Sequence, residues 1–349
     1  MPDESPEPSL DRYARQTRFA PVGEQGQRKL LASRALIVGC GALGTVLANT
    51  LVRAGVGHVR IVDRDFVELN NLQRQVLFDE DDVAGTLPKA VAAADKLRRI
   101  NSQVEIEPIV ADVDHTNIVA LCDNVDVILD GTDNFEIRFL LNDAALHLGI
   151  PWIYGGCIGA EGQTMSILPG ETPCLRCLMQ EAPPPGSTPT CDTAGIVGPI
   201  INVIASLECM EAIKIMCGQR EAVSRVLTVV ELWDNRWRQV QLASLREGAD
   251  CPACRRQEFP WLKGERGSHT AVLCGRNAVQ LSFPGRERLD LAAQAEKLQA
   301  VGRVSRNPFL LRLHVADFVV TLFADGRAII GGTDDIATAR TVYARYIGN

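Results

Sequence analysis

The chain has 349 residues, of which 46% are hydrophobic, so it can form one large domain with a packed core and a small second one. A formal net charge of −7 and the lack of a long basic block argue against nucleic acid as a partner. The eleven cysteines, an odd number, favour a reducing cytoplasm in which thiols bind metal or react rather than form disulfides.

The N-terminal part of the chain predicts a tail and a partly helical segment. Residues 1–10 are acidic and proline-rich and lack the apolar core of a secretory signal, so we expect a disordered tail. Residues 11–32 should be partly helical, with interruptions at Gly23 and Gly26. Arg15 would share a helix face with the arginine three residues earlier. By itself that pair indicates only a solvated basic patch.

The next stretch predicts a nucleotide site on a parallel sheet. It reads as a strand at 35–38, a glycine turn, a helix at 45–54 and a strand at 59–62. Gly39, Gly41 and Gly44 allow a sharp turn close to phosphate, and the new helix directs N–H groups at the anion. Asp63 comes 19 residues after Gly44, about where an acid meets a ribose hydroxyl. Strand, turn, helix and acid in this order favour nucleotide binding.

Polar side chains after this unit bear on which nucleotide is bound. Asp65, Asn71 and Arg74 follow the second strand, and Lys89 follows later. A dehydrogenase needs apolar walls for nicotinamide, so these residues favour a polyphosphate over NAD. Asp133 follows another apolar strand and could hold magnesium, as Arg74 and Lys89 could hold phosphates. Each taken singly fits a solvated loop, but their convergence at strand ends favours a site.

Helices and strands alternate beyond the glycine turn. The expected elements are helices at 88–100, 117–121 and 134–148, strands at 104–110, 125–129, 151–155 and 163–168, and a loop with Gly155, Gly156 and Gly159. Alternation predicts an α/β, Rossmann-like sheet with right-handed crossovers. From about residue 151 the alternation stops, so we expect mixed or antiparallel strands there, including strands at 227–234 and 238–242.

One long helix is expected at residues 198–217. It is apolar nearly all round, which suits a fully buried helix in the core or in a subunit interface. Glu208, Glu211 and Lys214 interrupt the most apolar stretch of the chain, so we expect no membrane span.

Two Cys-x-x-Cys pairs predict a structural zinc site. Cys174 and Cys177 form the first pair, and Cys251 and Cys254 form the second. Two such turns supply four thiolates, which complete a tetrahedral site and leave no open position for water. A single pair could serve redox chemistry, but two pairs favour zinc.

Between these pairs lies a further thiol of interest. Residues 179–193 are rich in proline, serine and threonine and predict a mobile loop. Cys191 ends this loop just before the long helix, where the helix N-terminus would lower the pKa of its thiol. We therefore regard Cys191 as a candidate nucleophile; the alternative is an incidental loop thiol. Five other cysteines lie in apolar or glycine-rich contexts and are expected in the core: Cys40, Cys122, Cys157, Cys209 and Cys217.

The C-terminal part predicts a separate small module. A charged linker at 264–268 precedes a module at 269–349. Its expected elements are strands at 270–283, 309–315, 318–323 and 328–330 and helices at 289–301 and 335–347. This is a small α+β module of uncertain role, and stabilisation or partner docking is the plainest interpretation.

Several motifs together resemble a known family, the ubiquitin-activating-enzyme-like adenylyltransferases of the ThiF type. They are RYARQ at 12–16, GCGALG at 39–44, VDRDFVELNNLQRQ at 62–75, LPK at 87–89 and DGTDN at 130–134. The resemblance extends to Cys254, about three-quarters of the chain, so we expect an adenylyltransferase domain at 11–263. Beyond residue 263 it fails, and a single cysteine in the tail speaks against the sulfur-delivering rhodanese domain that some relatives carry there.

The resemblance implies an activity that composition and spacing do not show. It implies ATP-dependent adenylation of the C-terminal glycine carboxylate of a small ubiquitin-fold sulfur carrier ending in Gly-Gly, with release of pyrophosphate. Gly39, Gly41 and Gly44 would shape the site, Asp63 would hold the ribose, and the phosphates would meet Asn71, Arg74, Lys89 and, from the partner subunit of a homodimer, Arg15. Asp133, with Asp65, would hold Mg²⁺. A sulfur donor protein is a possible further partner.

Three other functions stay open at this point. In relatives that form covalent intermediates a cysteine at the position of Cys191 attacks the adenylated carrier, so an activating enzyme of a conjugation system with a Cys191 thioester is the main alternative. A nucleotide-binding scaffold without turnover is a second, although Arg74, Lys89 and Asp133 speak against it. An NAD dehydrogenase is a third.

Overall fold

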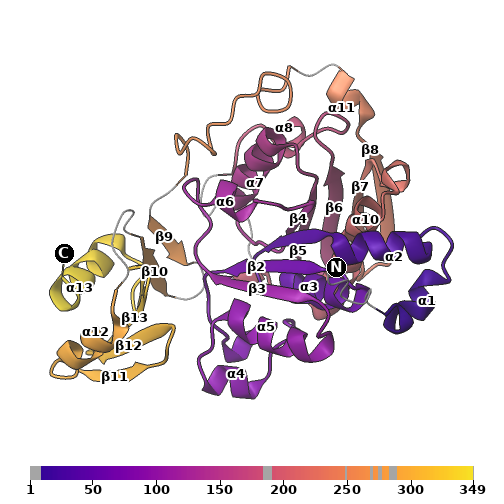
Figure 1. Ribbon diagram of the computed structural model, residues 1–349. Coiled ribbons are helices and arrows are strands. Elements are labelled where there is room, and N and C mark those ends of the chain that lie inside the picture. Colours follow the sequence, from indigo (N-terminus) through magenta and orange to yellow (C-terminus); the bar gives the residue numbers. More distant parts are fainter. Residues whose placement is uncertain are drawn as a thin grey trace, which may run out of the picture. The chain divides into compact units, whose positions relative to one another are not determined.

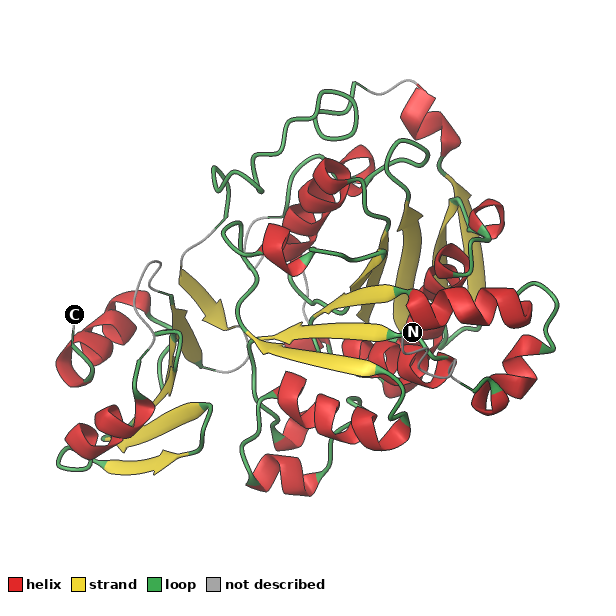
Figure 2. Cartoon of the chain, viewed as in Figure 1, coloured by secondary structure: helices red, strands yellow, loops and turns green. Residues whose placement is uncertain are grey.

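The computed structural model describes residues 9–183, 191–247, 250–267, 270–273, 277–282 and 289–348 (Figures 1 and 2). The chain divides into two compact units. The first comprises Met1–Pro183 and Ile196–Glu265, and the second comprises Pro184–Gly195 and Arg266–Asn349. No helix in the described part is long and apolar enough to cross a membrane.

The first unit is built on one eight-stranded sheet (Figure 1). In spatial order its strands are β3 (Glu105–Val110), β2 (His58–Asp63), β1 (Arg34–Val38), β4 (Val127–Asp130), β5 (Trp152–Ile158), β6 (Glu161–Ile167), β7 (Val226–Glu231) and β8 (Arg236–Gln241). Neighbours from β3 to β5 pair in parallel and those from β5 to β8 pair antiparallel. This confirms the predicted α/β sheet that continues into mixed strands.

Helices cover both faces of this sheet. One core packs α3 (Ala42–Ala54), α5 (Lys89–Ile100) and α10 (Gly198–Met216) against one face. The other core holds α6 (Ile118–Leu121), α7 (Phe135–Leu148) and α8 (Leu175–Leu178). The strands β1 and β4 are buried on both faces, which explains why they read as continuous apolar runs in the sequence.

Short elements fill the connections of this unit. They are η1 (Asp11–Tyr13), α1 (Ala14–Thr17), α2 (Gly23–Ala32), η2 (Leu69–Asn71), α4 (Glu80–Ala84), η3 (Arg220–Ala222) and α11 (Ala243–Glu247). One example is α4, which begins at an acidic capping box because Asp79 accepts from the backbone N–H of Asp82 and Asp82 accepts from that of Asp79. Apart from α2, these elements have three to five residues each, too few to show a periodic apolar pattern.

Two expectations about glycines are wrong, and α10 is only partly buried within a single chain. Gly26 lies inside α2, and a side chain there would meet Cys217 Sγ at 3.3 Å, so the glycine serves close helix packing. Gly155 and Gly156 lie inside β5, not in a loop. Only one side of α10 is buried, because the helix lies along the sheet with Met210 48% exposed on its outer side.

The second unit contains a six-stranded antiparallel sheet. In spatial order its strands are β11 (Arg303–Arg306), β12 (Leu310–Val315), β13 (Phe318–Phe323), β14 (Ala328–Gly331), β10 (Ala278–Leu281) and β9 (Thr270–Leu273). Its core also takes in α12 (Leu291–Leu298) and α13 (Ile336–Tyr346). Sequence analysis missed β11, whose Arg-Val-Ser-Arg sequence offers a single apolar residue to reveal an edge strand.

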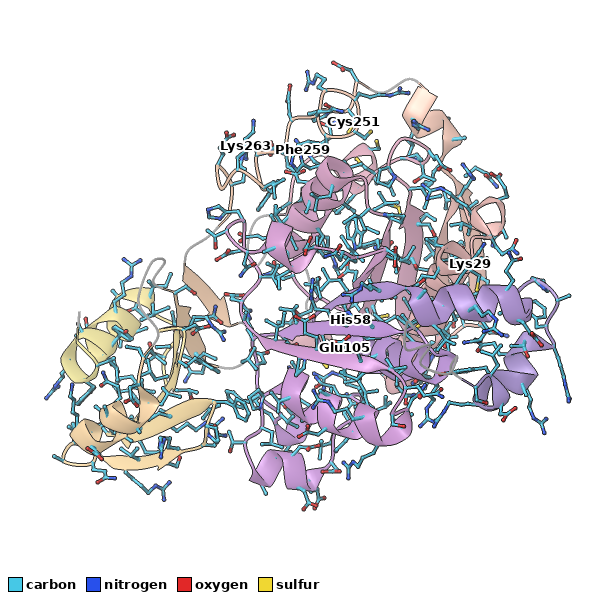
Figure 3. The ribbon with its side chains drawn as sticks, viewed as in Figure 1. Lys29, His58, Glu105, Cys251, Phe259 and Lys263 are labelled. Atoms are coloured by element: carbon cyan, nitrogen blue, oxygen red, sulfur yellow. The ribbon has the colours of Figure 1, made fainter. Side chains whose placement is uncertain are left out.

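Helix α7 ties two distant segments of the first unit together. Asn142 Oδ1 accepts from the backbone N–H of Leu175 at 2.9 Å, and Asp143 Oδ2 accepts from that of Trp261 at 3.0 Å. On the same helix, His147 packs edge-on against Phe259 with ring centroids 5.6 Å apart. Figure 3 labels Phe259 and Cys251 on this C-terminal segment, which lies beside α7.

We predict that Asp143→Asn changes the pH dependence of stability. Burial raises the pKa of Asp143 to about 6, so the folded protein holds this proton more tightly than the unfolded chain. Its contribution to the free energy of unfolding therefore falls as the pH rises from about 4 to about 6, by roughly 2 to 3 kcal/mol. The asparagine keeps an oxygen for the Trp261 N–H but does not titrate.

The measurement is urea unfolding of both proteins at pH values from 4.5 to 7.5. The variant should gain stability relative to the parent protein up to about pH 6, with a constant difference above that. A difference that is independent of pH would show that Asp143 does not titrate in this range.

Candidate functional site

The glycine turn between β1 and α3 allows the ends of two strands to approach closely. Gly39 has a φ of +90°, and a side chain there would lie 2.6 Å from Gly131 O. A side chain on Gly44 would lie 1.9 Å from Gly39 O, so no other residue fits. Gly41 differs, because its nearest neighbour would be Gln75 Nε2 at 3.9 Å. The turn thus leaves open space at Gly41, where the helix begins.

Asp63 connects the end of β2 to this turn. Its Oδ2 accepts from the Cys40 N–H at 2.6 Å, and its Oδ1 accepts from the Asp65 N–H at 2.7 Å. Burial raises the pKa of Asp63, the nearby Lys89 ammonium opposes that rise, and Asp65 adds to it. A carboxylate has about four acceptor directions, so it retains capacity for a ligand hydroxyl.

Lys89 and Asp65 form a buried ion pair next to Asp63. Lys89 Nζ lies 3.3 Å from Asp65 Oδ2, and the backbone N–H of Lys89 also donates to the backbone oxygen of Asp65 at 2.9 Å. Lys89 is only 4% exposed, so the pairing offsets the cost of burying its charge. A cation is thereby held at the carboxyl edge of the sheet, beside the glycine turn.

Arg64 is a charged residue of this edge that the sequence analysis did not single out. Its guanidinium lies 3.1 Å from Asp112, at the end of the neighbouring strand β3. Burial alone would lower the pKa of Arg64, but Asp112, Asp65, Asp133 and Asp63 together raise it. Its place between two acids in the motif Asp-Arg-Asp is the only sequence signal that could have identified it.

Asn71 and Arg74 lie on the segment that follows β2. Asn71 is buried, and its Oδ1 accepts from the Glu68 N–H at 3.1 Å, so part of its role here is to cap the start of the short helix η2. Arg74 is partly exposed and donates from Nη1 to Asn70 O at 2.7 Å, which leaves other guanidinium donors for a ligand.

Asp133 and Arg15 complete the set of residues predicted at the nucleotide. Asp133 follows β4 and is exposed at the carboxyl edge. Arg15 is exposed on α1, and within the described chain no hydrogen bond or ion pair connects it to the group around Asp63. The structure thus brings together the glycine turn, Asp63, Asp65 and Lys89, and leaves Arg15 outside this group.

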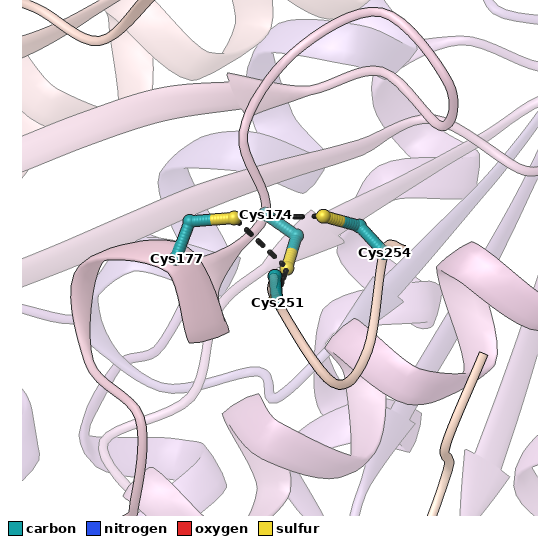
Figure 4. Close-up of side chains that lie close together, drawn as sticks. All are labelled: Cys174, Cys177, Cys251 and Cys254. Carbon is teal, nitrogen blue, oxygen red and sulfur yellow. Dashed lines mark hydrogen bonds between the residues drawn. The ribbon is translucent and has the colours of Figure 1, made fainter. Parts of the chain in front are cut away.

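The four cysteines of the two Cys-x-x-Cys pairs converge (Figure 4). Cys174 Sγ lies 3.9 Å from Cys177 Sγ and 3.7 Å from Cys251 Sγ, and Cys177 Sγ lies 3.5 Å from Cys254 Sγ. Sulfur atoms at the corners of a tetrahedral zinc site are about 3.8 Å apart. The arrangement therefore fits a metal with four thiolate ligands.

The other cysteines are placed as follows. Cys191 begins the one-turn helix α9 (Cys191–Ala194), and its side chain lies outside the described residues. The five cysteines expected in the core lie in the first unit, where Cys157 is half-buried and the rest are buried: Cys40, Cys122, Cys157, Cys209 and Cys217.

We predict that Gly44→Ala destabilises the protein and that Gly41→Ala does so far less. The methyl group at position 44 meets a backbone carbonyl, which cannot move without shifting β1, so a loss of about 1–3 kcal/mol is expected. At position 41 the methyl group meets open space, so the change should stay within about 1 kcal/mol. The measurement is urea unfolding of both variants, and equal losses would refute the close approach.

Comparisons with known proteins agree with this geometry. The model of the ThiF family matches residues 13–253. The sulfur carrier protein ThiS adenylyltransferase of Bacillus subtilis is 47% identical over 338 residues, which cover 97% of this chain and 99% of that protein. The SAMP-activating enzyme E1 of Haloferax volcanii is 40% identical over 245 residues, or 70% of this chain and 88% of that protein.

Solved structures show the same fold. A crystal structure of E. coli MccB with succinimide superposes with a TM-score of 0.59 at 22% sequence identity, covering 67% of this chain and 72% of that one. At this identity the likeness concerns the fold alone. The family match extends through the glycine turn, the acids of the sheet edge and the first three cysteines of the cluster, and the Bacillus subtilis relative matches over 97% of the chain. The chain therefore belongs to the ThiF family.

Proposed function

We propose that this protein uses ATP to adenylate the C-terminal glycine carboxylate of a small ubiquitin-fold sulfur carrier ending in Gly-Gly. The observation that supports this most is the 47% identity, over 97% of the chain, to an enzyme named for adenylation of a sulfur carrier. The product would be a step toward a thiocarboxylate for sulfur transfer. The charged sheet edge beside the glycine turn supplies the chemistry that such a reaction needs.

The reaction needs positioning and charge neutralisation more than proton transfer. A carboxylate oxygen of the carrier attacks the α-phosphorus of ATP, the bond to the bridging oxygen of the β-phosphate breaks, and pyrophosphate leaves with the electron pair. The attacking carboxylate is already ionised at neutral pH, so no general base is required. The protein's task is to align the two reactants and to stabilise the charge on the phosphates.

Residues of the sheet edge are suited to these tasks. Gly41 and the N-terminus of α3 would receive a phosphate, and Asp63 would accept from the ribose hydroxyls. Lys89, fixed by its pair with Asp65, would hold a phosphate without first having to be ordered. Arg74 and Asn71 would add donors from the neighbouring segment.

Magnesium fits the same edge. Asp133 presents an exposed carboxylate there, and Asp65, paired with Lys89, lies nearby, so the edge carries oxygen donors of the kind that Mg²⁺ prefers. Bound together with ATP, the ion would offset phosphate charge. Asp133 itself would orient the metal–nucleotide complex toward the incoming carboxylate.

A homodimer would bring Arg15 into the reaction. Arg15 is exposed, and within the described chain it makes no hydrogen bond or ion pair with the edge residues. We therefore expect it to reach the phosphates of the partner subunit. The exposed side of α10, which includes Asn202, Ser206 and Met210, is a candidate surface for that contact. A sulfur donor protein would then act on the adenylated carrier, in the cytoplasm that the free thiols favour.

A Cys191 thioester is not favoured over this scheme. It would serve a conjugation system, whereas the relative that is 47% identical over most of the chain is named for adenylation of a sulfur carrier. For the C-terminal module at 269–349 we propose a stabilising or partner-docking role.

We predict that purified protein exchanges pyrophosphate with ATP only when a suitable carrier is present. Candidate carriers ending in Gly-Gly are added one at a time, and isotope exchange into ATP is measured. Asp133→Asn should lower the exchange rate by about 100-fold, because the carboxylate that would hold Mg²⁺ at the phosphates is lost. The control is Asp123→Asn, an exposed aspartate that precedes β4, which should leave the rate unchanged.

Two outcomes would count against the proposal. If no carrier supports exchange although ATP binds, the substrate is not a sulfur carrier of this kind. If exchange occurs and Asp133→Asn leaves it unchanged, the assignment of Asp133 is wrong while the reaction stands.

We also propose that the four-cysteine cluster binds a structural zinc ion. The spacing of the sulfur atoms fits tetrahedral thiolate coordination, and four protein ligands leave no position for a reacting water. Cys174 and Cys177 follow β6, whereas Cys251 and Cys254 follow β8 and α11. Zinc would therefore fasten the C-terminal segment of the first unit to its middle.

We predict one zinc ion per chain and a large loss of stability without it. Cys254→Ser should abolish zinc binding and lower the melting temperature by about 10 °C, because a cross-link between distant segments is lost. Cys122→Ser, at a buried thiol outside the cluster, should keep the zinc. Metal content by plasma mass spectrometry and calorimetric melting test this, and a Cys254→Ser protein with full zinc content would disprove it.

A further inference from the structure

The position of Asp133 depends on a turn that other residues hold. Asp133 lies on the exposed turn that connects β4 to α7. At the start of α7, Asn134 Oδ1 accepts from the Glu136 N–H at 2.8 Å. At the end of β4, the Gly131 N–H donates to Val38 O at 2.8 Å. Hydrogen bonds therefore fix the backbone on both sides of Asp133. The turn itself is held by two further side chains, Asp130 and Arg138.

Asp130 and Arg138 form a buried ion pair beneath this turn. Arg138 Nε donates to Asp130 Oδ2 at 3.1 Å, and the two side chains are 8% and 0% exposed. Burial raises the pKa of Asp130, and the Arg138 guanidinium opposes that rise. The other carboxylate oxygen accepts from the backbone N–H of Thr132 at 2.9 Å and from its hydroxyl at 2.7 Å.

Arg138 also grips the backbone directly. Its Nη2 donates to Thr132 O at 2.7 Å and to Gly155 O on β5 at 3.0 Å. Its guanidinium lies 5.3 Å from the ring centroids of both Phe135 and Tyr154. A planar fork can make such contacts at once, whereas a lysine ammonium cannot span a carboxylate and two carbonyls.

A second buried acid, Glu208, lies close to β5. Its carboxyl is fully buried on α10, and a side chain on Gly155 would lie 2.0 Å from its Oε1. Burial raises the pKa of Glu208 well above its usual range, the Asp130 carboxylate raises it further, and the Arg138 guanidinium opposes the rise. The hydrogen bonds of Arg138 go to Asp130 and to the carbonyls of Thr132 and Gly155.

We propose that Arg138 is a positioning residue that fixes the Asp133 turn and thereby sets the affinity of the enzyme for Mg²⁺ in the ATP complex. The proposal rests on the proposed function, in which Asp133 holds that ion. Arg138 fixes Thr132, the residue before Asp133, through its carbonyl and, by way of Asp130, through its N–H and hydroxyl. If the turn loosens, the carboxylate loses its fixed direction although its charge is kept.

The test measures ATP binding by titration calorimetry, with Mg²⁺ and with EDTA, and therefore needs no carrier. Arg138→Lys keeps the charge but loses the fork, so the gain in ATP affinity from Mg²⁺ should fall by about 10- to 100-fold. ATP affinity in EDTA should stay unchanged. Thr132→Val is a second variant in case Arg138→Lys does not fold. It removes the hydroxyl contact to Asp130 and should lower the Mg²⁺-dependent gain by a smaller factor.

Arg60→Lys is the matched control. Arg60 donates to Glu107 at 2.8 Å and to the carbonyls of Leu121 and Asp123 at 2.5 and 3.1 Å, the same set of acceptor types away from the turn. Its replacement should cost stability and leave the Mg²⁺-dependent gain intact. Glu208→Gln, which keeps the size of this buried side chain and removes its acid, should also leave the Mg²⁺-dependent gain intact.

Asp133→Asn separates the two ideas. If it abolishes the Mg²⁺-dependent gain while Arg138→Lys and Thr132→Val keep it, the positioning role is wrong and the proposed function stands. If Asp133→Asn also keeps the gain, the assignment of the ion to Asp133 fails, and the role of Arg138 fails with it.

Discussion

The first unit depends on the close approach of two backbone turns at the carboxyl edge of its sheet. Positions 39, 44 and 131 are all glycine, and a side chain at any of them would lie 1.9–2.6 Å from a neighbouring carbonyl oxygen. Because β1 and β4 are adjacent, this contact brings the turn after β1 next to the turn that holds Asp133. The contact places the phosphate site and the metal-binding carboxylate that we propose at one edge of the sheet.

The charges around this contact are buried at a cost that pairing partly offsets. Lys89 is paired with Asp65, and Arg138 with Asp130, and in each pair the cation is nearly inaccessible to water. Apolar residues of similar size would stabilise such positions as well or better. The pairs are therefore best explained by the orientation that they impose, because each holds a charged or polar group at a fixed place along the sheet edge.

Local sequence patterns were enough to predict elements and motifs formed by neighbouring residues. They failed for features that depend on contacts between residues far apart in the sequence. The glycine turn, the strands β1, β2 and β4 and the Cys-x-x-Cys pairs each have a short-range signature. No short-range signature places Gly155 inside β5. The glycine is needed there because the side chain of Glu208, 53 residues later in the sequence, leaves no room for another side chain. Arg138 was overlooked for the same reason, since its acceptors lie on β4, the turn and β5.

Helix α7 carries the constraint from the nucleotide edge to the cysteine cluster. Arg138, at the end of its first turn, donates to the carbonyl of Thr132 next to Asp133, and Asn142, one turn later, accepts from the backbone N–H that follows Cys174. Asp143 beside it holds the segment that follows Cys254. Helix α7 thus contacts both the turn that carries Asp133 and the two segments that carry the cysteine cluster. The metal site that we propose would then serve adenylation indirectly, by fixing the register of α7 against the sheet.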